Sequence, residues 1–194
     1  MKPIERSEVM GLADYETIRD RFRARVIEEK KHGRRVHVGP KATAVFENRD
    51  TVLLQIQEML RTERITKESS IQHEIATYNE LIPNKDELSA SVMIEIADND
   101  ERDAFLIKAR GFERSVALVV DGEKQPATWD PARELPERTS AVHYLKFPLT
   151  AQAAAHLRAK GKDASLAIVV EHPAYEARVT LTPATAQSLA DDLA

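Results

Sequence analysis

The second half of the chain contains an internal repeat, and this repeat constrains the fold more than any other feature. The segment KARGFERSVALVVD at 108–121 aligns without a gap with RAKGKDASLAIVVE at 158–171, at an offset of 50 residues, and six of the 14 pairs are identical. The register extends outward, since Val92 matches Val142. One copy cannot cover its own sheet face, whereas two copies can cover each other. We therefore expect a pseudo-two-fold arrangement.

Each copy predicts the order strand, helix, strand, strand, because alternating apolar runs flank a helical run. The first copy spans about 90–129 and the second about 140–182. The expected segments are SVMIEI, ERDAFLIKARG, SVALVVD and QPATW, then AVHYLKF, AQAAAHLRAKG, SLAIVVE and YEARVTL. The segment TPATAQSLADDLA predicts a closing C-terminal helix. The linker DPARELPERTS contains two Pro and five charged residues, so we expect it to be exposed, as a cover for a sheet edge or as a partner contact.

The sequence of the first half, residues 1–88, predicts helices around a β-hairpin. A helix is predicted from the spacing of Tyr15, Phe22 and Val26, with Lys30, Lys31 and His32 in its last turn before Gly33. The segments RRVHV and ATAVF, joined by GPK, predict the hairpin. Asp50 then caps a second helix, a third begins at Ser69 or Ser70, and Pro83 ends it. A short link makes these two helices antiparallel.

These elements predict an α+β fold in one compact unit. Residues 1–88 form an N-terminal helix, a β-hairpin and an antiparallel helical hairpin. Residues 89–194 form two tandem βαββ repeats in a mainly antiparallel sheet, followed by the C-terminal helix.

Composition excludes several classes of function. The chain has no Cys, which excludes disulfides, thiolate catalysis and Cys-ligated zinc or Fe–S clusters held by this chain alone. Its six Gly form no phosphate-binding loop, and no G-x-S-x-G is present. A net charge of −4 argues against a nucleic-acid surface. No signal peptide and no apolar run long enough to cross a membrane is visible, so we expect a cytoplasmic protein.

The charge is unevenly distributed. Residues 1–66 hold 14 Lys and Arg against 11 Asp and Glu, a net of +3, whereas the remainder holds 14 against 21, a net of −7. The positive charge concentrates in RDRFRARVIEEKKHGRR. This stretch is either a solvated helix face or a site for an anionic ligand or an acidic partner.

The helical hairpin carries carboxylates close to its apolar stripes. On a helical wheel Glu63 falls in the stripe of the second helix, Glu58 falls outside it, and Glu74 lies at the edge of the stripe of the third helix. A carboxylate on a core stripe requires a partner. Arg19 and Arg23, one turn apart, are able to clamp it.

The alternatives to an arginine partner are exposure of the carboxylate to solvent at the helix end and binding of a metal ion. A metal site would use Glu63, Glu74 and His73 with iron or manganese, although the hairpin has no Glu-x-x-His. The ionic network or docking face expected here consists of Arg19, Arg23, Arg49, Glu58, Glu63 and Glu74.

The histidines show no metal-ligand spacing such as H-E-x-x-H. His37 alternates out of phase with its apolar neighbours, so it faces solvent or a partner. His143 shares a strand face with Leu145 and Phe147 and is expected in the core or in an interface, and His172 is expected in an exposed turn. A shared metal site of His37, His143 and His172 stays open.

Several segments resemble an uncharacterised bacterial family, the domain-of-unknown-function family 3501. The resemblance covers most of the chain, and its most specific pieces are FENRDT and QEMLRTER. It implies an accessory role in an iron or oxidative-stress pathway, with a rubrerythrin-type or Fe–S oxidoreductase protein as partner. It carries over no catalytic residue.

Three functional hypotheses follow. The first is a non-enzymatic interaction or accessory module that docks through the helical hairpin. The second is a metal-dependent redox protein or enzyme, and the third is an anion-binding protein that uses the arginine-rich helix. A free strand edge also makes a homodimer an expectation.

Overall fold

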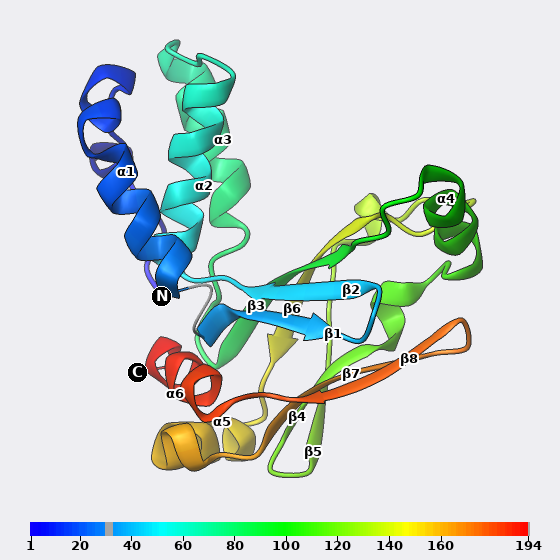
Figure 1. Ribbon diagram of the computed structural model, residues 1–194. Helices are drawn as coiled ribbons and strands as arrows, with labels where there is room; N and C mark the ends of the chain where they lie inside the picture. Colours follow the sequence, from blue (N-terminus) through cyan, green and yellow to red (C-terminus); the bar gives the residue numbers. More distant parts are fainter. Residues whose placement is uncertain (30–32, 194) are drawn as a thin grey trace.

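The computed structural model describes residues 1–29 and 33–193, and its elements follow the predicted order (Figure 1). The expected helix end at Lys30, Lys31 and His32 lies outside the described residues. The helices are α1 (Leu12–Glu29), α2 (Arg49–Thr62), α3 (Glu68–Asn79), α4 (Asn99–Lys108), α5 (Ala151–Lys160) and α6 (Pro183–Asp192), with short 3-10 turns at Arg6–Glu8, Phe112–Ser115, Pro131–Arg133 and Gly161–Asp163.

Two antiparallel four-stranded sheets form the body of the molecule. Sheet A has the order β1-β2-β3-β6, and sheet B has the order β5-β4-β7-β8. The strands are β1 (Arg35–Val38), β2 (Ala42–Phe46), β3 (Glu87–Ile94), β4 (Val116–Val120), β5 (Glu123–Pro126), β6 (Val142–Pro148), β7 (Leu166–His172) and β8 (Tyr175–Thr180). The α+β prediction with mainly antiparallel sheet is confirmed. The predicted hairpin at the N-terminal side is β1 and β2, which extend the sheet of the repeats.

The two repeats are related by a pseudo-two-fold axis through both sheets. In sheet B, Leu118 pairs with Ile168, its own counterpart in the second copy. In sheet A, Val92 pairs with His143 and Met93 with Val142, a register centred between counterparts. Each copy thus contributes its first strand to sheet A and its next two strands to sheet B, so neither copy buries a core alone.

One hydrophobic core fills the space between the sheets. Alternate residues of each strand point into it, among them Val92, Leu118, Leu145 and Ile168. Helix α4 lies at one end of this core, and α5 and α6 lie at the opposite end (Figure 1). The helices therefore close the open ends of the sandwich and leave the outer face of sheet A for other elements.

Helices α1, α2 and α3 form a bundle that stands beside sheet A (Figure 1). The bundle has its own small core around Val52, Ile56 and Ile75. Helix α2 begins where Asn48 accepts a hydrogen bond from the Thr51 amide. Because β2 leads directly into α2, the bundle is held at the end of the sheet.

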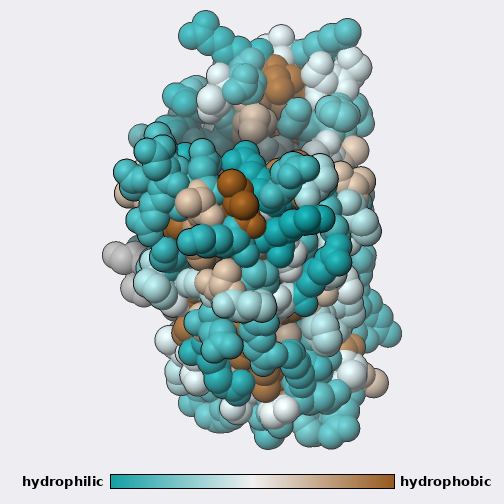
Figure 2. Space-filling model, turned by 90° about the vertical axis from the view of Figure 1, so that its right-hand side faces the viewer, coloured by the Kyte–Doolittle hydropathy of each residue, from teal (hydrophilic) through white to brown (hydrophobic). Residues whose placement is uncertain are grey.

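Figure 2 shows the molecule from the side of α4. Hydrophobic residues form separate spots on a mainly hydrophilic surface in that view. Ile107 of α4, 59% exposed, is the most exposed large apolar residue in the described part of the chain. This face therefore offers no continuous apolar patch.

Candidate binding groove on sheet A

The outer face of sheet A forms the floor of a groove whose wall is the helical bundle. The groove has a volume of about 650 Å³. Its floor comes from all four strands of the sheet, and its wall comes from α1, α2 and the end of α3 with the turn after it. The lining residues are Ile27, Arg35, His37, Val45, Glu47, Gln55, Tyr78, Leu81, Ser91, Met93, Val142 and Tyr144.

Glu47 is a nearly buried carboxylate in this lining, with 8% of the residue exposed. Ser91 Oγ donates a hydrogen bond of 2.7 Å to Oε1, and Thr51 Oγ1 donates one of 2.5 Å to Oε2. The residue directly precedes the N-terminus of α2, where negative charge is favoured. Within the described residues no Lys, Arg or His forms an ion pair with Glu47.

Two tyrosines lie in the same lining. Burial raises the pKa of Tyr144, and the nearby Tyr78 and Glu47 raise it further against the opposing effect of Arg133. Tyr144 and Glu47 thus share the lining of one groove. The guanidinium of Arg133 lies 5.1 Å from the centroid of the Tyr144 ring, and it also binds Glu80 at 2.8 Å.

A polar network covers the other end of the groove. Thr43 Oγ1 donates to Glu95 at 2.5 Å and faces His37 Nδ1 at 3.2 Å, and Arg35 binds Glu95 at 2.8 Å. The hydrogen bond from Thr43 lowers the pKa of Glu95, with a further contribution from Arg35. Glu95 is thus neutralised by a cation, in contrast to Glu47.

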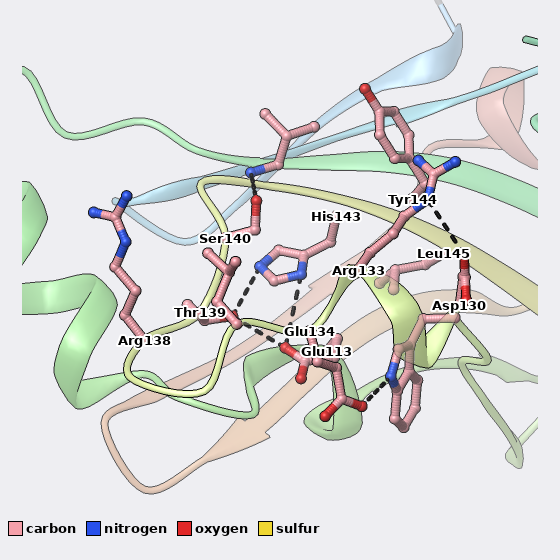
Figure 3. A pocket seen from close by; sticks show the side chains of 13 residues that line it. Glu113, Asp130, Arg133, Glu134, Arg138, Thr139, Ser140, His143, Tyr144 and Leu145 are labelled. Atoms are coloured by element: carbon pink, nitrogen blue, oxygen red, sulfur yellow. Dashed lines mark hydrogen bonds and ion pairs between the residues drawn. The ribbon is translucent and has the colours of Figure 1, made fainter. Parts of the chain in front are cut away.

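A smaller pocket of about 150 Å³ adjoins the groove and shares Val142 and Tyr144 with it. Figure 3 shows the His143 ring between Thr139 and Glu113. Thr139 Oγ1 donates to Glu113 at 3.0 Å and lies 3.2 Å from His143 Nε2. Burial lowers the pKa of His143, and Glu113 only partly offsets this effect.

This arrangement does not form a nucleophile–base pair. The hydroxyl of Thr139 donates to the carboxylate of Glu113, and the direction of its contact with His143 Nε2 depends on the tautomer of the imidazole. The hydroxyl is therefore held by the carboxylate rather than activated by the imidazole. The cluster satisfies polar groups below β6, as the sequence predicted for a core histidine.

Of the residues predicted for an ionic network, Arg19, Arg23 and Glu58 lie together, whereas Arg49 pairs with Glu8. Arg19 binds both carboxylate oxygens of Glu58 at 2.8 Å, and Tyr15 Oη donates to Oε1 at 2.7 Å. Arg23 is 4.0 Å away. The hydrogen bond from Arg19 is the largest contribution that lowers the pKa of Glu58. The clamp expected from Arg19 and Arg23 thus joins α1 to α2.

The placement of Glu63 in an apolar stripe is wrong. Helix α2 ends at Thr62, so Glu63 is the C-cap residue and is exposed. Glu74 on α3 is half-buried and His73 is exposed. Within the described residues no group of three His, Asp or Glu is placed to hold a metal ion. The iron or manganese site stays a prediction from the sequence.

The other predicted residues also serve packing between elements. Arg49 binds Glu8 at 2.7 Å and the backbone carbonyl of Lys2 at 2.7 Å, which ties the N-terminal segment to α2. Arg25 of α1 binds Asp50 at 3.0 Å. The basic helix is therefore neutralised in part by α2. The prediction that His172 is exposed is wrong, because the residue is 8% exposed and its Nε2 faces the carbonyl of Arg110 at 3.1 Å.

Sequence reasoning missed the groove residues Glu47, Tyr78, Ser91 and Tyr144. The alternation of ATAVF provides one signal, because it places Glu47 on the face opposite to Phe46. No local sequence pattern predicts that Tyr78 and Tyr144 line the same groove, because the two residues come from α3 and β6.

No helix in the described part of the chain is long and apolar enough to cross a membrane. The cytoplasmic location, the homodimer and the rubrerythrin-type or Fe–S oxidoreductase partner stay predictions.

Comparison with known proteins places the chain among uncharacterised relatives. No curated protein matches it. A crystal structure of a novel protein of unknown function from Burkholderia pseudomallei is similar over 100% of both chains, with 36% identity and a TM-score of 0.91. The family model described as protein of unknown function (DUF3501) matches residues 3–193. The chain therefore belongs to the DUF3501 family.

Proposed function

We propose that this protein is a non-enzymatic ligand-binding module whose working surface is the groove on the outer face of sheet A. The observation that carries the proposal is the polarity of a nearly buried floor: Glu47 and Ser91 are each 8% exposed, yet they line a groove on the outer sheet face. Buried polar groups on such a face are costly unless they are satisfied. Here Ser91 and Thr51 donate hydrogen bonds to the two carboxylate oxygens of Glu47.

The size and chemistry of the groove support a ligand. Its volume of about 650 Å³ falls within the ~300–1,000 Å³ of small-molecule sites. Apolar side chains of Val45, Leu81 and Met93 lie beside a few convergent polar groups. That mixture is typical of a site in which apolar contacts supply affinity and polar groups fix orientation.

The arginine-rich helix supports an anion site less well than the groove supports a ligand site. Arg19, Arg23 and Arg25 of α1 already face carboxylates of α2. An anion would have to compete with Glu58 and Asp50 for these side chains.

A fragment screen by ¹H–¹⁵N NMR tests the proposal. We expect saturable shifts that cluster at His37, Val45, Ser91, Met93 and Tyr144. The variant Met93→Trp, which fills the groove, should lose them, whereas Ile107→Trp on the exposed side of α4 should keep them. Saturable binding that the Met93→Trp variant retains, or shifts that cluster away from sheet A, would contradict the proposal.

A further inference from the structure

The charge balance of the groove defines a class of ligand. Three carboxylate side chains in the described residues are nearly buried, those of Glu47, Glu113 and Asp192. Asp192 binds Arg34 at 2.7 Å, whereas Glu113 shares a buried cluster with Thr139 and with His143, whose imidazolium form burial disfavours. Glu47 alone of the three lines the large groove and has hydroxyl partners only.

A buried carboxylate without a cation is unfavourable compared with one that is paired. The two hydroxyls and the start of α2 stabilise the carboxylate of Glu47. They do not neutralise its charge. A ligand that brings one positive charge and N–H donors into the groove would remove this imbalance.

The aromatic neighbours favour the same charge. The faces of tyrosine rings attract ammonium and guanidinium groups. Within the molecule, the face of the Tyr144 ring already attracts the guanidinium of Arg133. Arg133 does not neutralise Glu47, because its guanidinium is bound to Glu80 and lies beside Asp130. The lining of the groove thus combines the carboxylate of Glu47 with the rings of Tyr78 and Tyr144.

We propose that Glu47, Tyr78 and Tyr144 form a subsite for the positively charged amine of a small organic molecule, whose apolar part lies against Val45 and Met93. This inference rests on the proposed function and deepens it. The ammonium would lie beside Glu47, where its N–H groups donate to the carboxylate, with the rings of Tyr78 and Tyr144 in the same lining. A small molecule fits better than a protein segment because the volume matches that class of ligand.

The test is an NMR titration with n-hexylamine, with n-hexanol as a neutral control and hexanoate as an anionic control of equal chain length. We expect the amine to bind the wild-type groove at least about tenfold more tightly than the alcohol, a difference of about 1.4 kcal/mol. Hexanoate should bind most weakly.

Two variants isolate the carboxylate. Glu47→Gln should weaken amine binding about tenfold and leave n-hexanol binding unchanged. Glu95→Gln, at the other end of the groove, should keep the amine preference, because Glu95 is already paired with Arg35. If Glu47→Gln does not fold, Tyr144→Leu serves instead and should reduce the preference for amine over alcohol.

Three results would overturn the inference. They are equal binding of amine and alcohol by the wild type, an amine preference that survives both Glu47→Gln and Tyr144→Leu, and tighter binding of the peptide acetyl-Gly-Lys-Gly-amide than of n-hexylamine, which would assign the site to a protein partner. Fragments that bind the groove without amine preference would overturn only this inference, whereas the absence of any groove binder in both experiments would remove the proposed function as well.

Discussion

At the scale of residues, Glu47 and His143 occupy opposite faces of the same sheet. Glu47 faces the groove and stays uncompensated by a cation, and His143 lies under β6 at 7% exposure with Glu113 and Thr139. Their positions follow from strand alternation, which the sequence shows. Their partners do not, because Ser91, Thr51 and Glu113 come from other elements.

The buried His143 predicts a pH dependence of stability. Its pKa in the folded state lies below the ordinary 6.5, because burial disfavours the imidazolium. As pH falls below about 6.5 the unfolded chain takes up a proton that the folded state resists, so stability decreases. The variant His143→Gln should lose less stability between pH 7 and pH 5 in urea unfolding than the wild type. The exposed control His73→Gln should follow the wild type, and equal slopes for both variants would contradict the account.

Glu58 and Glu63 offer a second test at this scale. Replacing Glu58 with Ala removes the bidentate contact with Arg19 and the hydrogen bond from Tyr15, which should lower the free energy of unfolding by about 1–3 kcal/mol. Glu63→Ala at the exposed helix end should change it by less than about 0.5 kcal/mol. Chemical denaturation measures both, and a larger loss for Glu63→Ala would restore the helical-wheel interpretation.

At the scale of elements, the repeat and the periodic patterns predicted the strands and helices well. The helical wheel failed at Glu63 because it assumed that α2 continues past Thr62. The His172 prediction failed because a turn residue was taken as exposed, whereas the carbonyl of Arg110 covers it. Local pattern carries no information about such contacts between distant segments.

The start of α2 gives the prediction at the element scale. Asn48 accepts from the Thr51 amide and donates to Glu29 of α1 at 2.9 Å. The change Asn48→Ala should therefore destabilise the protein by about 1–2 kcal/mol. Lys67 occupies the same position before α3 but makes no side-chain cap, so Lys67→Ala is the matched control and should be nearly neutral. Similar thermal midpoints for the two variants would show that the cap does not hold the bundle.

At the scale of the whole molecule, Arg34 connects the two predicted regions. Its guanidinium, 2% exposed, binds Glu29 at the end of α1 and Asp192 in α6. The duplicated scaffold was predictable because its two copies are visible in the sequence. The connection between residues 1–88 and the C-terminal helix was not, since Arg34 and Asp192 are 158 positions apart.

Removal of Asp192 should leave Arg34 buried with a single partner. We expect Asp192→Ala to lower the free energy of unfolding by about 3 kcal/mol or more. The neighbouring exposed Asp191, which accepts from Gln187, provides the control, and Asp191→Ala should cost less than about 0.5 kcal/mol. If Asp192→Ala and Asp191→Ala lowered the free energy of unfolding equally in denaturant, the ion pair between Arg34 and Asp192 would contribute no specific stability.

The groove depends on all three scales, because its floor is the shared sheet, its wall is the bundle, and Glu47 in its lining has no cationic partner among the described residues whereas Arg35 is paired with Glu95. The most direct measurement is a crystal structure of the protein with n-hexylamine. The account predicts the amine nitrogen about 2.7–2.9 Å from a carboxylate oxygen of Glu47, with the alkyl chain along Val45 and Met93. An amine bound away from sheet A, or in the groove with its nitrogen turned away from Glu47, would contradict it.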